Sequence, residues 1–251
     1  MNTILVTGGS GVLGRALLPT LEGRADVRVL SRHADPRPTY RQGDLSSGAG
    51  LADALRGVST VIHAASQPSR PQADVDMTGV LLAAAREAGV RHLVYVSIVG
   101  CDQVRAFPYY RAKTQVEALI AGSGVPCTVV RATQFHEFVA FMLSRLTRAP
   151  LLPLPGLPLQ PVDVYAAAQQ IAQVALGAPQ GRAPDIVGPQ VLPLPELART
   201  WADATGARTR VLAVPAARRF TPLTRSDLSG VGRTWAEWLA QEATRPNPYA
   251  G

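Results

Sequence analysis

A glycine-rich turn follows a short apolar run near the start of the sequence, where residues 3–14 read TILVTGGSGVLG. The helix-like pattern RALL comes directly after this turn. Gly8, Gly11 and Gly14 permit a tight turn, a close approach of the backbone to a diphosphate, and close packing of the helix on the strand. The N–H groups at the start of a helix also attract an anion. The strand, turn and helix together predict a dinucleotide site, and an ordinary glycine turn is the alternative.

The size of the chain limits its architecture. Its 251 residues, 47% of them apolar, suffice for one large α/β domain or for a cofactor domain with a small lobe. We expect a Rossmann-type, doubly wound parallel sheet in a single NAD(P)-binding domain over residues 1–251, with residues 183–251 contributing most of a small C-terminal substrate lobe. No apolar run approaches the roughly 18 residues that a membrane span needs. We therefore expect a soluble, cytoplasmic protein with no membrane partner.

Composition also narrows the class of ligand. Two cysteines and four histidines without ligand spacing predict no metal site. The formal net charge is +7, but the arginines are spread along the chain, so we expect no nucleic-acid partner. All 25 basic residues except Lys113 are arginines. Because an ammonium differs from a guanidinium in geometry and in how readily its pKa shifts, this bias supports a special role for Lys113.

The apparent second strand, residues 26–32, ends where a Rossmann sheet meets the adenosine ribose. An acidic residue there would bind the ribose hydroxyls of NAD, whereas Ser31 and Arg32 suit the 2′-phosphate of NADP. The pattern favours NADP(H), and the nearby Asp35 keeps NAD open. A buried strand over 59–66 ends in small residues that let a cofactor lie against the backbone, and its His63 is typical of a packed histidine.

Three polar residues form the candidate catalytic set. Ser97 lies at the end of a buried strand over 91–100, where open α/β sheets bind ligands. Tyr109 and Lys113 are four residues apart where the helix 114–121 opens, so on a helix they share one face. A tyrosine pKa near 10 is too high for efficient acid–base chemistry at neutral pH, and Lys113 is the cation that would lower it. Tyr110 is the alternative phenol.

Across its whole length the chain resembles the atypical, NmrA-like branch of the short-chain dehydrogenase/reductases, which is related to nucleoside-diphosphate-sugar epimerases. One departure is the sequence His-Ala-Ala-Ser at 63–66, where ordinary short-chain reductases carry an asparagine-rich motif. The resemblance is carried by Thr7–Gly14, Gly43-Asp44-Leu45, Val96-Ser97, Tyr109-x-x-x-Lys113 and Arg131-Ala132-Thr133-Gln134-Phe135.

The resemblance implies that Tyr109 donates a proton to a substrate carbonyl, that Lys113 also binds the nicotinamide ribose, and that Ser97 holds the carbonyl oxygen. It also implies that the loop at 132–138 closes over the nicotinamide, which makes Phe135, His136 and Phe138 candidate substrate-binding residues, with a surface position as the alternative for His136. The expected cofactor residues are Gly8, Ser10, Gly11, Val12, Leu13, Gly14, Ser31, Arg32, Asp44, Leu45, Ala64, Ala65, Ser66, Lys113, Ala132 and Thr133.

The second half of the chain gives a coarser pattern. Five prolines in residues 150–161 predict an ordered connector or a pocket lid. A helix over 165–176 follows, with Asp163 as its N-cap. We then expect strands at 185–187 and 209–214 and helices at 194–205 and 233–242, the last docked by Trp235 and Trp238.

These observations predict an NADP-dependent oxidoreductase that reduces a ketone or enone of a medium-sized, fairly apolar small molecule, in a monomer or homodimer. Two alternatives stay open: an epimerase, dehydratase or isomerase that retains its cofactor, and a non-catalytic NmrA-like redox sensor that binds NADP. Net consumption of NADPH separates the first alternative from a reductase.

Overall fold

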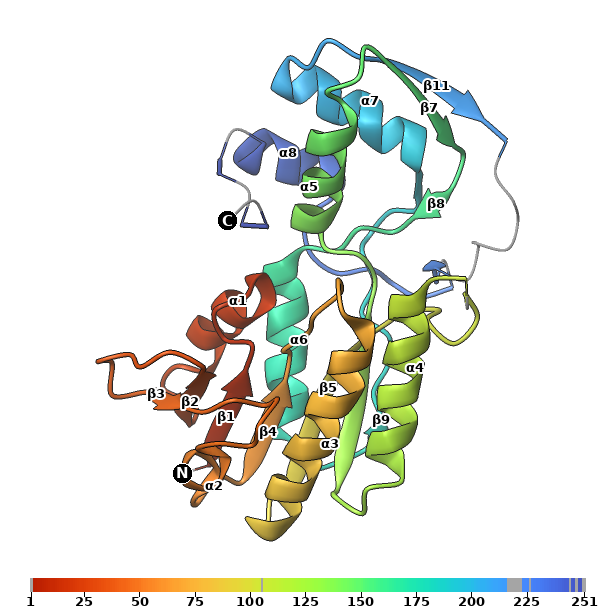
Figure 1. Cartoon of the computed structure of the whole chain (residues 1–251). Coiled ribbons are helices and arrows are strands. Elements are labelled where there is room, and N and C mark those ends of the chain that lie inside the picture. Colours follow the sequence, from red (N-terminus) through yellow and green to blue (C-terminus); the bar gives the residue numbers. More distant parts are fainter. Residues whose placement is uncertain are drawn as a thin grey trace. The chain divides into compact units, whose positions relative to one another are not determined.

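The computed structural model describes residues 2–104, 106–215, 223–225, 227–243, 245–246 and 248–249 (Figure 1). The chain divides into two compact units. The sheet unit comprises Met1–Arg131 and Ala168–Pro184, and the second unit comprises Ala132–Ala167 and Asp185–Gly251. The assignment of residues 183–251 to a substrate lobe stays a prediction.

A seven-stranded sheet forms the centre of the sheet unit, in the order β3-β2-β1-β4-β5-β6-β9. β1 pairs in parallel with β2 on one side and with β4 on the other, so the strand order reverses at β1. This confirms the predicted Rossmann-type fold, in which ligands bind at the carboxyl ends of the strands beside the reversal. The strands are β1 (Thr3–Thr7), β2 (Asp26–Ser31), β3 (Tyr40–Gln42), β4 (Thr60–His63), β5 (His92–Ile98), β6 (Cys127–Ala132) and β9 (Gly181–Arg182).

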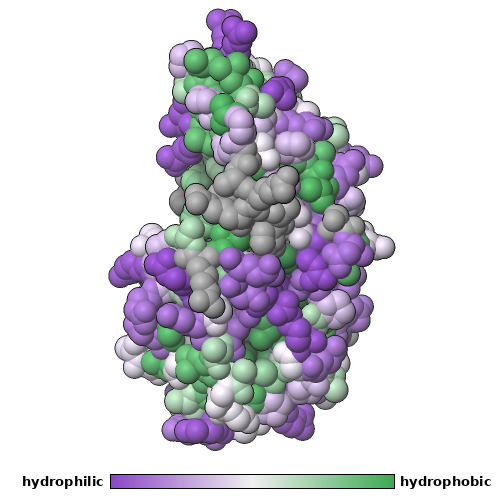
Figure 2. Space-filling model, turned by 90° about the vertical axis from the view of Figure 1, so that its right-hand side faces the viewer, coloured by the Kyte–Doolittle hydropathy of each residue, from purple (hydrophilic) through white to green (hydrophobic). Residues whose placement is uncertain are grey.

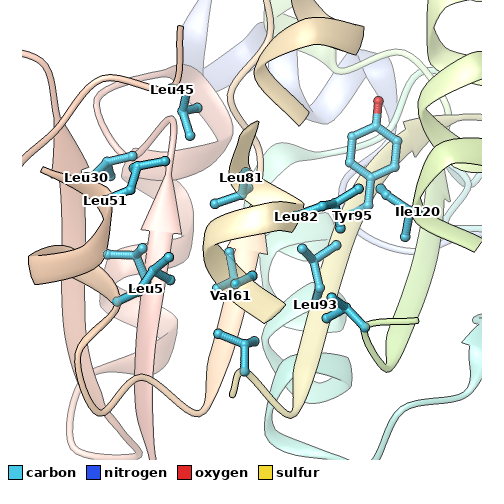
Figure 3. Packing of buried hydrophobic residues seen from close by; sticks show 14 of the residues in the cluster. Leu5, Leu30, Leu45, Leu51, Val61, Leu81, Leu82, Leu93, Tyr95 and Ile120 are labelled. Carbon is cyan, nitrogen blue, oxygen red and sulfur yellow. The ribbon is translucent and has the colours of Figure 1, made fainter. Parts of the chain in front are cut away.

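Helices cover both faces of this sheet. α3 and α4 lie in front of it in Figure 1, and α6 lies behind it. Under α3, Leu81 and Leu82 pack with Val61 and Leu93 of the sheet, and Tyr95 points its hydroxyl away from these apolar side chains (Figure 3). The helices are α1 (Val12–Leu21), α2 (Leu51–Leu55), α3 (Pro71–Glu87), α4 (Pro108–Ala121) and α6 (Val164–Leu176).

Two boundaries in the sheet unit matter for the site. α4 begins at Pro108 rather than at 114, because a proline suits the first helical position, where its missing N–H is not needed. Tyr109 and Lys113 therefore both lie within the helix. The strand predicted at 185–187 is wrong: β9 is Gly181–Arg182, and Ile186 makes only an isolated bridge to Ala132. Pro184 stands between them and has no N–H to continue a ladder.

The second unit contains two small sheets, one of which corrects the expected connector at 150–161. β7 (Leu151–Pro155) pairs in parallel with β11 (Arg210–Val214), and β8 (Pro158–Leu159) pairs antiparallel with β10 (Leu192–Pro193). Each strand has one partner in these two-stranded sheets. A proline can therefore direct its nitrogen to the unpaired side, which a central strand would not allow.

Tryptophans hold the helices of the second unit together. The rings of Trp235 and Trp238 stack with centroids 5.3 Å apart, and Trp201 lies 6.4 Å from Trp235. α8 begins at Trp235. Its N-cap residue Thr234 and its third residue Glu237 form a capping box. Both expected docking tryptophans are buried. The helices are α5 (His136–Leu146), α7 (Leu194–Thr205) and α8 (Trp235–Glu242).

The surface mixes polar and apolar residues. Hydrophilic residues, purple in Figure 2, cover much of the face seen there, and smaller hydrophobic patches lie between them. None of the helices in the described part of the chain combines the length and the apolar character that crossing a membrane requires.

Two glycines inside helices differ sharply in the space around them. A Cβ on Gly14 of α1 would overlap the Gly8 carbonyl oxygen and the Gly9 backbone, whereas a Cβ on Gly79 of α3 would meet only Leu119 Cδ2 at 3.9 Å. The close approach of α1 to the glycine turn therefore depends on Gly14. The sequence predicted close packing of the helix on the strand, whereas the close contact at Gly14 is with the turn residues Gly8 and Gly9, which follow β1.

We expect Gly14→Ala to lower the free energy of unfolding by about 1–3 kcal/mol, because backbone must move to admit the methyl group. Gly79→Ala is the matched control and is expected to raise it by about 0.5–1 kcal/mol through helix propensity. Urea unfolding of both variants measures this. Equal effects of the same sign would contradict the packing described for Gly14.

Candidate active site

The glycine turn brings β1 against the loop after β4. Gly8 has a φ of +72°, and a Cβ on it would lie 2.6 Å from the Ala65 backbone nitrogen. The Gly11 N–H donates to the Gly8 carbonyl over 3.0 Å, which closes the turn. Ser10 and Gly11 are exposed at its tip, while Leu13 and Gly14 are buried against the sheet. The turn thus leaves its outer backbone open to a ligand.

The start of α1 fits a diphosphate. Gly11 is its N-cap and has no side chain to accept the first N–H groups, and the first turn contains no acidic residue. Those N–H groups and the helix dipole therefore remain available to an anion. On these grounds the residues predicted for the cofactor diphosphate, from Gly8 to Gly14, fit an NAD(P)H molecule.

The end of β2 carries the residues predicted to meet the adenosine ribose. Arg32 is exposed, and the Ser31 hydroxyl donates to the His33 carbonyl over 2.9 Å. Asp35 accepts two hydrogen bonds from the Arg37 guanidinium, at 2.8 Å and 2.6 Å. These bonds lower the pKa of Asp35 to about 2. Its carboxylate is therefore already engaged by a cation.

Two other residues predicted to bind the cofactor, Asp44 and Leu45, serve the local fold. Asp44 accepts a hydrogen bond from the Ser46 N–H over 2.9 Å, which closes an Asx-type turn. Leu45 is buried in the core beside Leu51 (Figure 3). Their contact with a cofactor stays a prediction.

A buried histidine connects the ends of β1, β4 and α3. The two ring nitrogens of His63 lie 2.7 Å from Thr7 Oγ1 and 3.1 Å from Thr78 Oγ1, and Thr78 donates to the Asp74 carbonyl. Burial, followed by the charge of Lys113, lowers the pKa of His63 to about 3, so its ring is neutral. This confirms that His63 is a packed histidine.

The Tyr109 hydroxyl belongs to a chain of hydrogen bonds between α4 and α3. It lies 2.8 Å from Ser66 Oγ, and the Ser66 hydroxyl donates to Asp74 Oδ2 over 2.5 Å. The Gln67 N–H donates to the other oxygen of Asp74 over 2.6 Å. Asp74 is buried near the start of α3. The structure thus joins the predicted Tyr109 and Ser66 and adds Asp74.

Lys113 is buried one helical turn from Tyr109. Its Nζ lies 4.0 Å from Asp74 Oδ2 and donates to the Val96 carbonyl over 3.4 Å. The same nitrogen lies 4.9 Å from the ring centroid of Tyr95 and 5.4 Å from that of Tyr109. The ammonium therefore faces both phenol rings and one carboxylate.

The phenol of Tyr109 is a weaker acid than free tyrosine. Burial raises its pKa to about 12, and the nearby Asp74 charge adds to the rise. Burial likewise raises the pKa of Tyr95 well above its usual range, against the influence of Lys113. The pKa of Tyr109 is therefore raised, whereas Lys113 alone was expected to lower it.

Ser97 takes part in a different network. Its hydroxyl lies 3.7 Å from Cys101 Sγ, and the Cys101 thiol in turn donates to Glu117 Oε1 over 3.6 Å. The Arg131 guanidinium donates to both oxygens of Glu117, at 2.8 Å and 2.5 Å, and to Asp102 at 2.8 Å. The Ser97 hydroxyl thus contacts this ion-paired group, whereas the Tyr109 hydroxyl contacts Ser66. A role of Ser97 toward a carbonyl stays a prediction.

The residues predicted to bind substrate lie in the second unit. His136 is fully buried against the stacked rings of Trp235 and Trp238, with its ring centroid 5.6 Å from each of theirs, and Nε2 lies 3.0 Å from the Arg233 carbonyl. Burial lowers its pKa to about 4. The alternative of a surface position for His136 is wrong because the tryptophans of α8 cover it, and a contact of His136 with substrate stays a prediction.

The other predicted residues of the 132–138 loop differ in burial and in their contacts. Phe135 is the N-cap of α5, and Phe138 is largely exposed, with its ring edge-on to Tyr249. Ala132 and Thr133 are buried, and the Thr133 N–H donates to the Ile186 carbonyl. Their predicted contacts with cofactor and substrate stay predictions.

Sequence reasoning missed Asp74 and Tyr95. Asp74 reads as an ordinary acidic residue near a helix start, and Tyr95 as one aromatic residue in an apolar strand. No motif marks either of them. The only available signal was that Asp74 follows β4 and that Tyr95 lies on β5. In the sheet, β4 lies next to β1 and β5 lies next to β4.

Comparison with protein families gives a match to the N-terminal half of the chain. The family described as NAD(P)H-binding matches residues 8–139, which are 132 of the 251 residues. Among curated proteins, the (4-alkanoyl-5-oxo-2,5-dihydrofuran-3-yl)methyl phosphate reductase of Streptomyces griseus subsp. griseus is 31% identical over 225 residues, covering 84% of this chain and 74% of the relative. The chain spans about half or less of several other curated relatives.

Solved structures share the fold. The Citrobacter sp. triphenylmethane reductase complexed with NADP(H) superposes with a TM-score of 0.71 at 21% identity, over 84% of this chain and 78% of that one. A short-chain dehydrogenase/reductase superfamily protein of Agrobacterium tumefaciens with bound NAD gives a TM-score of 0.73 at 19% identity, over 97% and 96% of the two chains.

The ion-paired group under Ser97 makes stability depend on pH. Burial alone would raise the pKa of Glu117, but hydrogen bonds from Arg131 and Ser97 hold it below its unfolded value of 4.5. This stabilisation is complete above that value and is lost as the pH falls through the folded-state pKa. Glu117→Gln is expected to cost about 3 kcal/mol at pH 7, because it leaves the buried Arg131 poorly paired.

Urea unfolding at several pH values tests this expectation, with Glu87→Gln on the exposed end of α3 as the control, expected to stay within about 0.5 kcal/mol of wild type. The difference between wild type and Glu117→Gln should narrow as the pH drops below 4.5. A difference that is the same at pH 7 and pH 3.5 would contradict the role of the Glu117 charge.

Proposed function

Because the chain belongs to the family of NAD(P)H-binding proteins, we propose that it is an NADPH-dependent reductase that reduces the carbonyl group of a ketone or an enone. The observation that carries this proposal is the position of Tyr109. Its hydroxyl is hydrogen-bonded to Ser66, the third residue after β4. The two residues before Ser66, Ala64 and Ala65, contact Gly8 of the glycine turn through their backbone. A proton donor thus stands beside the strand ends where the cofactor binds.

Tyr109, Lys113 and the start of α1 have different roles in the proposed reduction. When bound, NADPH would supply a hydride for the carbonyl carbon or, in an enone, for the β carbon. Tyr109 gives its hydroxyl proton to the substrate oxygen, and the phenolate formed faces the Lys113 ammonium. Lys113 would also hold the nicotinamide ribose, and the N–H groups at the start of α1 would hold the diphosphate. The product is an alcohol, or an enol that becomes the saturated ketone.

The preference for NADPH over NADH is part of the proposal. The exposed Arg32 at the end of β2 suits a 2′-phosphate, since guanidinium and phosphate make charge-assisted hydrogen bonds. Asp35, a nearby acidic residue that would favour NAD, is held by Arg37. Both observations support NADPH.

The proposed substrate class is a carbonyl compound with apolar character. The Streptomyces relative is named for reduction of an alkanoyl-oxo-dihydrofuran phosphate, which supports a carbonyl compound. In this chain the exposed Phe138 at the start of α5 supports a medium-sized, fairly apolar molecule.

We expect Arg32→Ala to weaken NADPH binding about 10- to 100-fold and to leave NADH binding within about twofold, because a charged hydrogen bond is worth about 1.5–3 kcal/mol. Titration by cofactor fluorescence measures both dissociation constants. Arg86→Ala, on an exposed arginine of α3, is the control for loss of positive charge. Equal weakening for the two cofactors would contradict the assignment of Arg32.

The reductase itself is tested by NADPH oxidation with a panel of ketones and enones. We expect Tyr109→Phe to lower kcat at least 100-fold while NADPH binding is retained, since general acid catalysis contributes about 10²- to 10⁴-fold. Tyr110→Phe is the matched control, because Tyr110 is the neighbouring residue of the same helix, and it should retain activity.

Other outcomes would redirect the assignment. Turnover without net NADPH consumption would indicate an epimerase, dehydratase or isomerase. Binding of NADPH with no turnover of any carbonyl compound would contradict the reductase proposal and favour a redox sensor.

A further inference from the structure

The hydrogen bonds around Asp74 have a defined direction. A carboxylate only accepts hydrogen bonds, and Asp74 accepts one from the Gln67 N–H and one from the Ser66 hydroxyl. Ser66 has a single hydroxyl proton, which it gives to Asp74 over 2.5 Å. The Ser66 oxygen can then only accept from the Tyr109 hydroxyl, 2.8 Å away. The phenol proton is thereby held in the chain Tyr109 to Ser66 to Asp74.

The same carboxylate also affects Lys113. Asp74 Oδ2 lies 4.0 Å from Lys113 Nζ, which is closer than the 5.4 Å between that nitrogen and the Tyr109 ring centroid. All of these side chains lie in the sheet unit, and Asp74 and Lys113 are both less than 5% exposed. A charge so poorly hydrated acts strongly on its neighbours. Asp74 therefore offsets part of the field through which Lys113 would favour a phenolate.

We propose that Asp74 is a positioning residue that keeps the proton on Tyr109, by engaging the Ser66 hydroxyl and by balancing the charge of Lys113. The inference rests on the proposed function, in which Tyr109 is the acid of a reduction. A reduction consumes a protonated phenol, whereas the reverse oxidation needs a phenolate as base. Asp74 thus biases the site toward reduction.

Other titratable groups face Tyr109 from the elements packed around it. His63 on β4 is neutral at physiological pH, and the Tyr95 phenol on β5 stays protonated. Lys113 lies on the same helix as Tyr109, and the ring of Tyr110 lies 6.3 Å away. The two charged side chains of the group are therefore Lys113 and Asp74, and of these only Asp74 opposes the phenolate.

The test removes the charge and reads the ionisation of one phenol. Tyr109 is replaced by 3,5-difluorotyrosine, whose ¹⁹F resonance reports its ionisation, and the pH midpoint is measured with and without Asp74→Asn. The asparagine keeps the bond from Gln67 and donates to Ser66, which frees the Ser66 proton for Tyr109. We expect the midpoint to fall by about one pH unit, a tenfold change in the ionisation constant.

Two control variants separate charge from packing. Asp76→Asn removes an exposed carboxylate from the same helix. Thr78→Val breaks the hydrogen bonds of Thr78 to His63 and to the Asp74 carbonyl but leaves the Asp74 charge in place. Both should leave the midpoint within about 0.3 pH units of the parent. Asp74→Ser, a smaller neutral side chain, replaces the asparagine variant if that variant does not fold.

An unchanged midpoint in the neutral Asp74 variant would overturn the proposal, and so would an equal fall in Thr78→Val, which would point to loosened packing. The readout needs neither substrate nor turnover. A fall in the midpoint together with no reduction of any carbonyl compound would therefore support the role of Asp74 in holding the proton and contradict the proposed reductase function.

Discussion

The contact between the backbone of Gly8 and that of Ala64 and Ala65 is the constraint on which the rest of the site depends. It requires a residue without a Cβ and with positive φ at position 8, and it fixes where the chain goes after β4. Ser66 follows directly, and the His63 ring between Thr7 and Thr78 connects the same strand end to the middle of α3. Through Ser66 the glycine turn is connected to Tyr109 and Asp74.

The fold and the glycine turn could be predicted because each depends on local chemistry that the sequence displays. Gly8, Gly11 and Gly14 follow an apolar strand, and the Tyr109–Lys113 spacing needs only a helix to bring the two side chains together. Asp74 could not be predicted as a partner, because its position depends on how β4, α3 and α4 pack in three dimensions. The burial of His136 was missed for a similar reason, since the tryptophans that cover it come about a hundred residues later.

Charge decides how the site differs from a simple tyrosine–lysine pair. Lys113 is the chain's only lysine, and it is buried between two phenol rings and one carboxylate. In a poorly hydrated site, a carboxylate at 4.0 Å limits what an ammonium does for a phenolate. The arrangement of Tyr109, Ser66 and Asp74 therefore suits an acid better than a base. Ser97 contacts a separate ion-paired group that stabilises the ends of β5 and β6.

In the proposed mechanism the glycine turn and Tyr109 serve one bound cofactor, and a crystal structure of the protein with NADP⁺ would show whether they do. The diphosphate is expected on the N–H groups at the start of α1, the 2′-phosphate beside Arg32, and the nicotinamide ribose within hydrogen-bonding distance of Lys113 Nζ. A cofactor bound elsewhere, or a nicotinamide remote from both Tyr109 and Lys113, would contradict it.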